Sequence, residues 1–377
     1  MNKQCAAVLA KVLPVVEPYE LYISYAGLGL MALVPIVFGT RASVEEAAKG
    51  NSNERISTSD AYMFPIIGSC VLFGFYMLFK YFSQQYINML LTAYFSMFGV
   101  ASLIKLLDSV VTPALPTLVT KLFEHHVKVV KTREKEAVVD FRFHAAHIAY
   151  AVLAALFMGL YVWTKHWAAN NVLGLAFALS AISLIHLDTF ATGCILLTGL
   201  FFYDIFWVFK TDVMVTVAKS FDVPVKLLMP KALGEYGMAR PVHMALLGLG
   251  DIVIPGVFVA LCHRFDEHLK QRKVSTRVSY FRASFFAYCL GLVCTVAVMH
   301  VFKAAQPALL YLSPACISSL LITALINGQI KAVFEYSTEA PEEIDSKKKK
   351  AKVESAEEEE AAPGTPSRRR KTAAKSD

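Results

Sequence analysis

Long apolar runs separated by short polar segments dominate the pattern of this 377-residue chain. A helix needs about 20 mostly apolar residues to cross the roughly 30 Å hydrocarbon core of a bilayer. Nine segments approach that length, so we expect helices at about 19–39, 61–79, 86–104, 145–163, 171–187, 189–209, 242–261, 281–302 and 307–326. The pattern predicts an all-α polytopic membrane protein, in which the boundary near residues 186–189 is the least clearly marked.

Composition divides the chain into two parts. The chain is 56% hydrophobic and 18% charged, but beyond residue 335 aromatic residues nearly vanish and charges crowd together. Such a segment cannot bury enough apolar surface to fold. We therefore expect a nine-span membrane domain at 1–335 and a disordered, charged cytosolic tail at 336–377.

The basic residues predict an orientation. With the N-terminus outside, the cytoplasmic segments carry 26 of the 37 Lys and Arg residues and the opposite side carries 10, with Arg282 at a helix mouth. Cytoplasmic loops of membrane proteins are enriched in these residues. The N-terminus is expected outside and the C-terminus in the cytosol.

The seven cysteines lie mostly within apolar segments. They form no CxxC pair and have no histidine at the spacing of metal ligands. The sequence therefore predicts no disulfide framework, no metal site and no cofactor.

Two aspartates interrupt consecutive apolar segments, Asp204 in FFYDIFWVF and Asp251 in LLGLGDIVIPG. A carboxylate at bilayer depth costs a few kcal/mol or more, so it indicates function. At 1.5 Å per residue, Asp204 lies about 8 Å from the end of its segment and Asp251 about 14 Å from the start of the next, antiparallel one. The two depths differ by about one helical turn, so the acids can pair.

Paired carboxylates suit two classes of membrane protein. In an aspartic protease they share one proton, and one activates water while the other protonates the substrate. In a proton-coupled transporter or channel, intramembrane carboxylates relay protons. A noncatalytic scaffold would need neither acid. Residue chemistry alone leaves protease and transporter near parity, although no convincing internal repeat of the transporter kind is present.

Three short motifs occur in order on the sixth, seventh and ninth segments. Tyr203-Asp204, Gly248-Leu249-Gly250-Asp251 and Pro307-Ala308-Leu309 resemble the YD, GxGD and PAL motifs of presenilin-type intramembrane aspartyl proteases. Longer stretches, such as TGCILLTGLFFYDIFWVFKTDVMVTVAKSF and AQPALLYLSPACI, resemble the signal peptide peptidase family more closely than presenilin. The resemblance covers most of residues 60–335.

The resemblance implies a presenilin-like fold and a role for each motif. Asp204 and Asp251 would be the catalytic pair. Tyr203, Gly248, Leu249 and Gly250 would shape the site, and Pro307, Ala308 and Leu309 would gate the substrate.

The resemblance also implies surroundings and substrates. The chain would lie in the endoplasmic reticulum membrane with a lumenal N-terminus, cut remnant signal peptides and type II-oriented membrane proteins, and form homo-oligomers, with no nucleic-acid partner. By analogy with presenilin, a short strand near residues 225–229 would pair with an unwound substrate. An amphipathic surface loop is an equally good interpretation of that segment.

Overall fold

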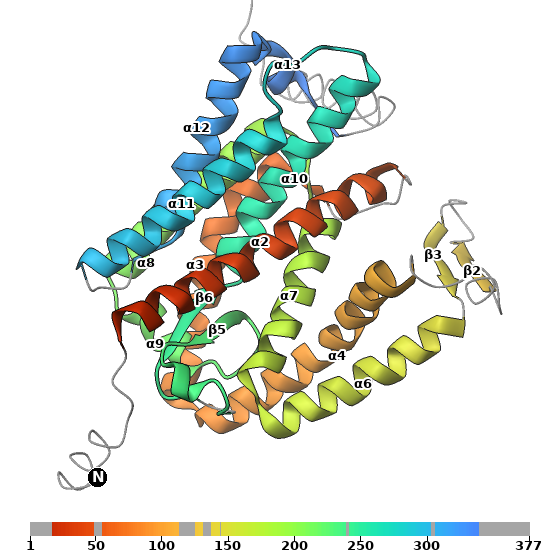
Figure 1. The fold of residues 1–377 in the computed structure, drawn as a ribbon. Helices are drawn as coiled ribbons and strands as arrows, with labels where there is room; N and C mark the ends of the chain where they lie inside the picture. The colour runs from red at the N-terminus through yellow and green to blue at the C-terminus, as the bar shows by residue number, and fades with distance from the viewer. Residues whose placement is uncertain are drawn as a thin grey trace, which may run out of the picture. The chain divides into compact units, whose positions relative to one another are not determined.

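The computed structural model describes residues 17–48, 55–112, 125–130, 137–143, 145–238, 241–302 and 306–338. The predicted tail, apart from its first three residues, therefore lies outside the described residues. The long helices are α2 (Pro18–Ala48), α3 (Thr58–Tyr81), α4 (Gln84–Val111), α6 (Ala145–Thr164), α7 (Trp167–Leu184), α8 (Phe190–Phe209), α10 (Gly250–Gln271), α11 (Tyr280–Phe302) and α12 (Leu309–Asn327) (Figure 1).

The remaining elements are short. They are the helices α9 (Val213–Ser220), η2 (Leu233–Glu235) and α13 (Ile330–Glu335), and the strands β1 (Arg55–Ile56), β2 (His125–Val130), β3 (Ala137–Phe143), β4 (His186–Leu187), β5 (Lys226–Pro230) and β6 (Met244–Gly248). The strands pair two by two, β1 with β4, β2 with β3 and β5 with β6.

Each of the nine predicted segments overlaps one long helix of the described residues, and the all-α polytopic fold is confirmed. Eight of these helices are long and apolar enough to cross a membrane. The ninth, α10, carries charged residues in its second half, among them Arg264 and Asp266.

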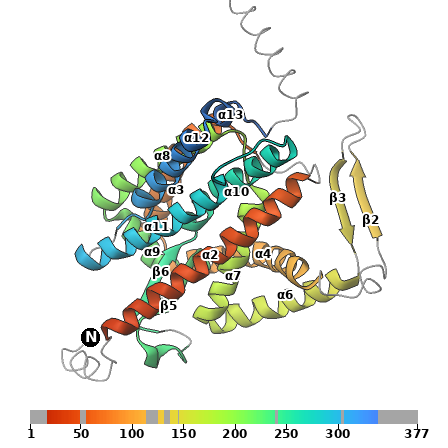
Figure 2. The same ribbon diagram turned by 45° about the horizontal axis from the view of Figure 1, so that its top comes forward.

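Helix α10 can carry these charges because it lies inside the helix assembly. It contacts α2, α7, α11 and α12, and both views show it beside α2, α7 and α11 (Figures 1 and 2). Phe258, Leu261 and Phe265 on this helix are almost completely buried. At Gly256 a methyl group would come within 2.6 Å of the Ile182 side chain, so this glycine allows α10 to approach α7 closely. The core of the protein is built around α10.

The predicted start of the seventh helix is wrong. The prediction placed it at about residue 242, but α10 begins at Gly250. The preceding residues 244–248 form β6, which pairs antiparallel with β5. Apolar residues alone do not distinguish a short strand from the first turns of a helix. Backbone pairing with a strand 18 residues earlier in the chain decided the outcome.

Candidate active site

Asp204 lies well inside α8 and is buried, with 4% of its surface exposed. Helix α8 begins after Thr189, whose side chain accepts a hydrogen bond from the Thr192 backbone N–H, as an N-cap residue does. The helix packs against α3 and α12. The start of α8 and its packing against these helices therefore determine where this carboxylate lies along the helix assembly.

Asp251 is the second residue of α10 and directly follows β6 and Leu249. It is partly buried. The acid therefore lies at a strand-to-helix junction rather than in the middle of a helix, which is where the predicted range of 242–261 placed it. Asp251 is nevertheless close enough to Asp204 for their carboxyl groups to interact electrostatically. The structure brings the two predicted acids together.

The start of α12 contributes a donor to this pair. The backbone N–H of Leu309 is directed at the Asp204 carboxyl group. Leu309 is the first residue of α12, and the first backbone N–H groups of a helix have no partner within it. Pro307, Ala308 and Leu309 are all buried. The PAL segment therefore places a free helix N–H beside one acid.

The two glycines of the GLGD segment differ in their surroundings. A methyl group on Gly248 would lie 3.3 Å from Oδ2 of Asp251, which is tighter than most contacts of a side chain. A methyl group on Gly250 would meet nothing within 4 Å. Only Gly248 is required, on steric grounds, by the position of the Asp251 carboxylate.

Leu249 joins the strand to the helix. Its backbone N–H donates to the Val225 carbonyl at 3.1 Å, and its carbonyl accepts from Val253 at 2.8 Å. Its side chain lies near the position that a methyl group on Gly174 of α7 would take. Leu249 therefore fixes where the hairpin ends and where α10 begins.

Tyr203, the remaining predicted site residue, packs against α3. A methyl group on Gly68 would lie 3.6 Å from its ring, and its ring centroid lies 6.3 Å from that of Trp207. Tyr203 also interacts electrostatically with the Asp204 carboxyl group. It thus connects the wall formed by α3 to one acid.

A further tyrosine, not singled out from the sequence, lies beside Asp251. The Tyr288 hydroxyl on α11 faces the Asp251 backbone carbonyl at 3.4 Å, a long hydrogen bond. Tyr288 is fully buried and interacts electrostatically with the Asp251 carboxyl group. The only sequence signal was a tyrosine in the middle of an apolar segment.

Metal ligands do not cluster in the part of the chain that the structure describes. No group of three or more His, Cys, Asp or Glu side chains could hold a metal ion there. The acids therefore have to be considered as a pair of carboxyl groups with backbone and tyrosine neighbours.

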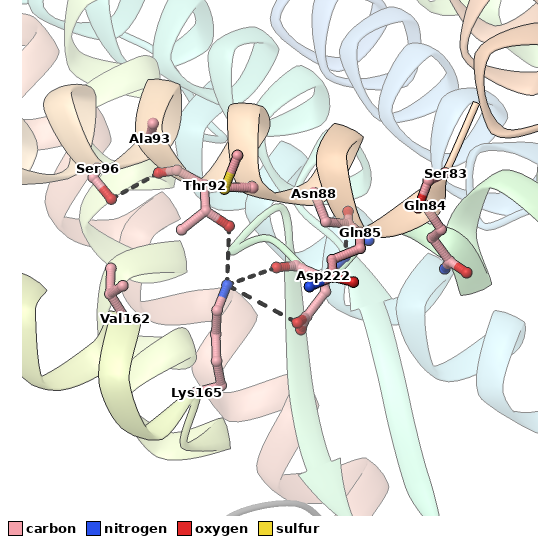
Figure 3. Close-up of a pocket in the computed structure, with 11 residues that line it drawn as sticks. Ser83, Gln84, Gln85, Asn88, Thr92, Ala93, Ser96, Val162, Lys165 and Asp222 are labelled. Atoms are coloured by element: carbon pink, nitrogen blue, oxygen red, sulfur yellow. Dashed lines mark hydrogen bonds and ion pairs between the residues drawn. The ribbon is translucent and has the colours of Figure 1, made fainter.

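A cavity of about 780 Å³, lined by several polar side chains, lies elsewhere, between α4 and the turns before α7 and β5 (Figure 3). Lys165 points into it and donates to the Thr92 hydroxyl and the Asp222 carbonyl, both at 3.0 Å. Neither Asp204 nor Asp251 lines this cavity. Its polar groups bind one another and hold the segment before β5 against α4.

Comparison with known proteins identifies the class. A family model described as signal peptide peptidase matches residues 48–340. The chain is 44% identical to the signal peptide peptidase of Mus musculus over 88% of this chain and 87% of that protein. It is 43% identical to the signal peptide peptidase of Homo sapiens over the same shares. It is also 36% identical to a probable intramembrane protease of Schizosaccharomyces pombe, over 84% of this chain and 96% of that one.

These matches decide between the two classes that residue chemistry left near parity. They cover both acids and all three motifs, and the relatives are named as peptidases or proteases rather than transporters. The chain belongs to the signal peptide peptidase family and is an intramembrane aspartyl protease.

Proposed function

We propose that Asp204 and Asp251 are the catalytic pair and that they hydrolyse peptide bonds within the transmembrane helices of substrates. The observation that carries this proposal is that a buried carboxyl group on α8 and a partly buried one at the start of α10 lie close enough to interact electrostatically. Two carboxylates so close together hold one proton between them.

The reaction needs only these two groups and water. The ionised carboxyl takes a proton from water as the water oxygen attacks the carbonyl carbon, and the protonated carboxyl gives its proton to the carbonyl oxygen. When the tetrahedral intermediate collapses, the C–N bond breaks, the leaving nitrogen receives a proton from one carboxyl group, and the other carboxylate takes a proton from a hydroxyl of the intermediate, so the pair again holds one proton. The Leu309 N–H positions one of the two carboxyl groups throughout.

The substrate has to be unwound, because a peptide bond within an intact helix is shielded by the helix. The predicted strand near residues 225–229 corresponds to β5, but we propose its partner β6 as the substrate-binding edge. In the β5–β6 register, Val225 pairs with Leu249 and Lys231 with His243 through hydrogen bonds. Along an antiparallel ladder, hydrogen-bonded residue pairs alternate with pairs that are not hydrogen-bonded. The backbone N–H and C=O groups of Met244, Leu246 and Gly248 therefore point away from β5.

This edge of β6 is available and well placed. Within the described residues, no strand other than β5 pairs with β6, and Leu246 is 56% exposed. Gly248 precedes Asp251 by three residues. An extended substrate that adds to β6 as a third strand would therefore run directly toward the acids.

The proposed substrates are remnant signal peptides and type II-oriented membrane proteins. The names of the mouse and human relatives, which specify signal peptides, support the first class, and the second is what the family resemblance implies. We place the chain in the endoplasmic reticulum membrane with its N-terminus in the lumen, its C-terminus in the cytosol, and homo-oligomers as its assembly.

The test is cleavage of a labelled signal peptide by the full chain purified in detergent. Asp204→Asn and Asp251→Asn should each lower kcat by at least about 1000-fold, because neither remaining acid can act as both acid and base. Asp212→Asn, an exposed aspartate near the end of α8 whose side chain caps nothing, is the matched control and should cleave normally.

Either of two results would overturn the proposal. One is a folded Asp204→Asn or Asp251→Asn variant that keeps full activity. The other is a wild-type chain that cleaves nothing but moves protons across liposome membranes, which would restore the transporter hypothesis.

A further inference from the structure

The outer edge of β5 is covered by side chains rather than by a strand. Asn171 donates through Nδ2 to the Leu228 carbonyl at 2.6 Å and accepts the Leu228 N–H through Oδ1 at 2.8 Å. Asn170 donates to the Lys226 carbonyl at 2.7 Å. From α2, the Ser24 hydroxyl donates to the Pro230 carbonyl at 2.6 Å. Four backbone groups on one edge of one strand therefore have side-chain partners.

These partners are buried. Asn170 and Asn171 are 5% and 4% exposed, and Ser24 is fully buried. Both asparagines lie in the first turns of α7, a helix apolar enough to cross a membrane. Unpaired amides in such a place would be costly, so their hydrogen bonds to β5 explain how the helix tolerates two adjacent asparagines.

The Asn171 side chain makes the same two hydrogen bonds to β5 that a residue of a neighbouring strand would make. A carboxamide offers one acceptor and N–H donors, as a peptide unit does. With both bonds made to the same residue, Leu228, the side chain acts as one residue of a neighbouring strand. β5 is thus paired on both edges, whereas β6 is paired on one, and α7 fixes which edge of the hairpin stays free.

We propose that Asn170 and Asn171 are positioning residues that hold the β5–β6 hairpin formed and in register before substrate arrives. This inference rests on the proposed role of β6 as the substrate-binding edge. A two-stranded hairpin alone is marginally stable, and ordering its backbone costs about 1–2 kcal/mol per residue. When α7 has already ordered it, substrate binding does not carry that cost.

The same anchors set the cleavage position. β6 leads into Asp251 within three residues of Gly248, so a hairpin fixed against α7 also fixes the offset between the paired substrate residues and the acids. Because strand registers that preserve side-chain faces differ by two residues, a loosened hairpin should produce additional cuts two residues away from the main one.

The experiment compares the full-length wild type with Asn171→Leu and Asn171→Asp on a labelled signal peptide. Losing one or two hydrogen bonds worth about 1 kcal/mol each should raise KM roughly tenfold. We expect kcat to change less than about threefold, since the acids are untouched. Mass spectrometry should show new products displaced by two residues. A merely structural role would lower the amount of active enzyme without moving KM or the cleavage position.

Asn327 provides a matched control. It donates to the Val278 carbonyl at 2.9 Å and accepts the Val278 N–H at 3.1 Å, the same pattern at the opposite end of α10 from the hairpin. Asn327→Leu should leave both KM and the cleavage position unchanged. If Asn171→Leu does not fold, Asn170→Ser, which removes one bond, replaces it.

The outcomes separate this inference from the proposed function. Folded Asn171 and Asn170 variants with wild-type KM and a single product would overturn the positioning role, as would an identical shift in Asn327→Leu. If the wild type fails to cleave, or Asp251→Asn still cleaves, the proposed function fails instead.

Discussion

The two acids of the proposed active site are held by different kinds of structure. Asp204 lies inside α8, where Trp207 Nε1 donates to the Ser69 hydroxyl of α3 at 3.0 Å and Tyr203 packs on the same helix. Asp251 lies at a junction whose position depends on backbone hydrogen bonds between β5 and β6. Side-chain packing therefore locates one carboxyl group and a hairpin locates the other.

Because these contacts are separate, one acid can be displaced while the other keeps its position. A change in the hairpin should move Asp251 and the substrate edge while Asp204 keeps its place in α8. Because the chemistry needs both acids at a short distance, a small shift of one member is enough to slow the reaction.

Gly248→Ala should have the largest effect among changes in the hairpin. Its new methyl group would lie 3.3 Å from Oδ2 of Asp251, so the carboxylate has to move by a few tenths of an ångström. Since a 1 Å misplacement costs about 100-fold, we expect kcat to fall by up to roughly tenfold, measured on a labelled signal peptide. Gly250→Ala, where the methyl group meets nothing within 4 Å, is the control. Equal losses in both variants would contradict the steric explanation.

Leu246→Pro should have a somewhat smaller effect. Proline removes the N–H that points away from β5 and leaves the β5 pairing intact, so the substrate strand loses one hydrogen bond. We expect KM to rise about fivefold, because one such bond contributes roughly 1 kcal/mol. Leu246→Ala removes the side chain and keeps the N–H, so it should bind substrate better than the proline variant. The reverse order would show that the side chain, not the strand edge, binds substrate.

The smallest effect is expected at the loop of the hairpin. Glu235 is buried, and its Oε2 accepts a hydrogen bond from the His243 backbone N–H at 2.9 Å. Its Oε1 lies 2.9 Å from Nδ1 of the His243 ring. Burial alone would raise the pKa of Glu235, but these hydrogen bonds and the imidazole outweigh it and hold the pKa below its ordinary value. This loop is separate from both acids, so Glu235→Gln should change kcat by less than about twofold.

The pH dependence of that variant has a definite sign. Because folding lowers the Glu235 pKa, its carboxylate stabilises the protein fully above the unfolded value of about 4.3, and this contribution is lost as the pH falls through the lower folded value. The melting temperature of the wild type should therefore exceed that of Glu235→Gln above about pH 5, and the two melting temperatures should converge in stronger acid. Glu267→Gln, from a pair with Lys270 at the protein surface, should show a much smaller difference, because such pairs contribute little to stability. A gap that appears only in acid would contradict the sign.

The chemistry of short sequence segments was sufficient to predict the two acids. Aspartates in apolar segments are rare because they are costly, so Asp204 and Asp251 could be selected without a structure. The register of β5 and β6, by contrast, depends on which backbone groups meet across a loop of 13 residues. That is why α10 was predicted to begin about eight residues too early. Asn170 and Asn171 were missed for a related reason, since nothing in the sequence shows that their amides face a strand more than 50 residues away.

The membrane fold, the approximate places of nine helices, the two candidate acids and the family could all be predicted from the sequence, because apolar length, isolated carboxylates and short motifs are each visible within a single segment. The three-dimensional arrangement was needed to show that Asp251 lies in the first turn of a helix and that the Leu309 N–H faces Asp204. It also shows that, among the described residues, no strand pairs with the second edge of β6. Those features arise from hydrogen bonds and contacts between segments distant in the chain, and such pairings have no local pattern to reveal them.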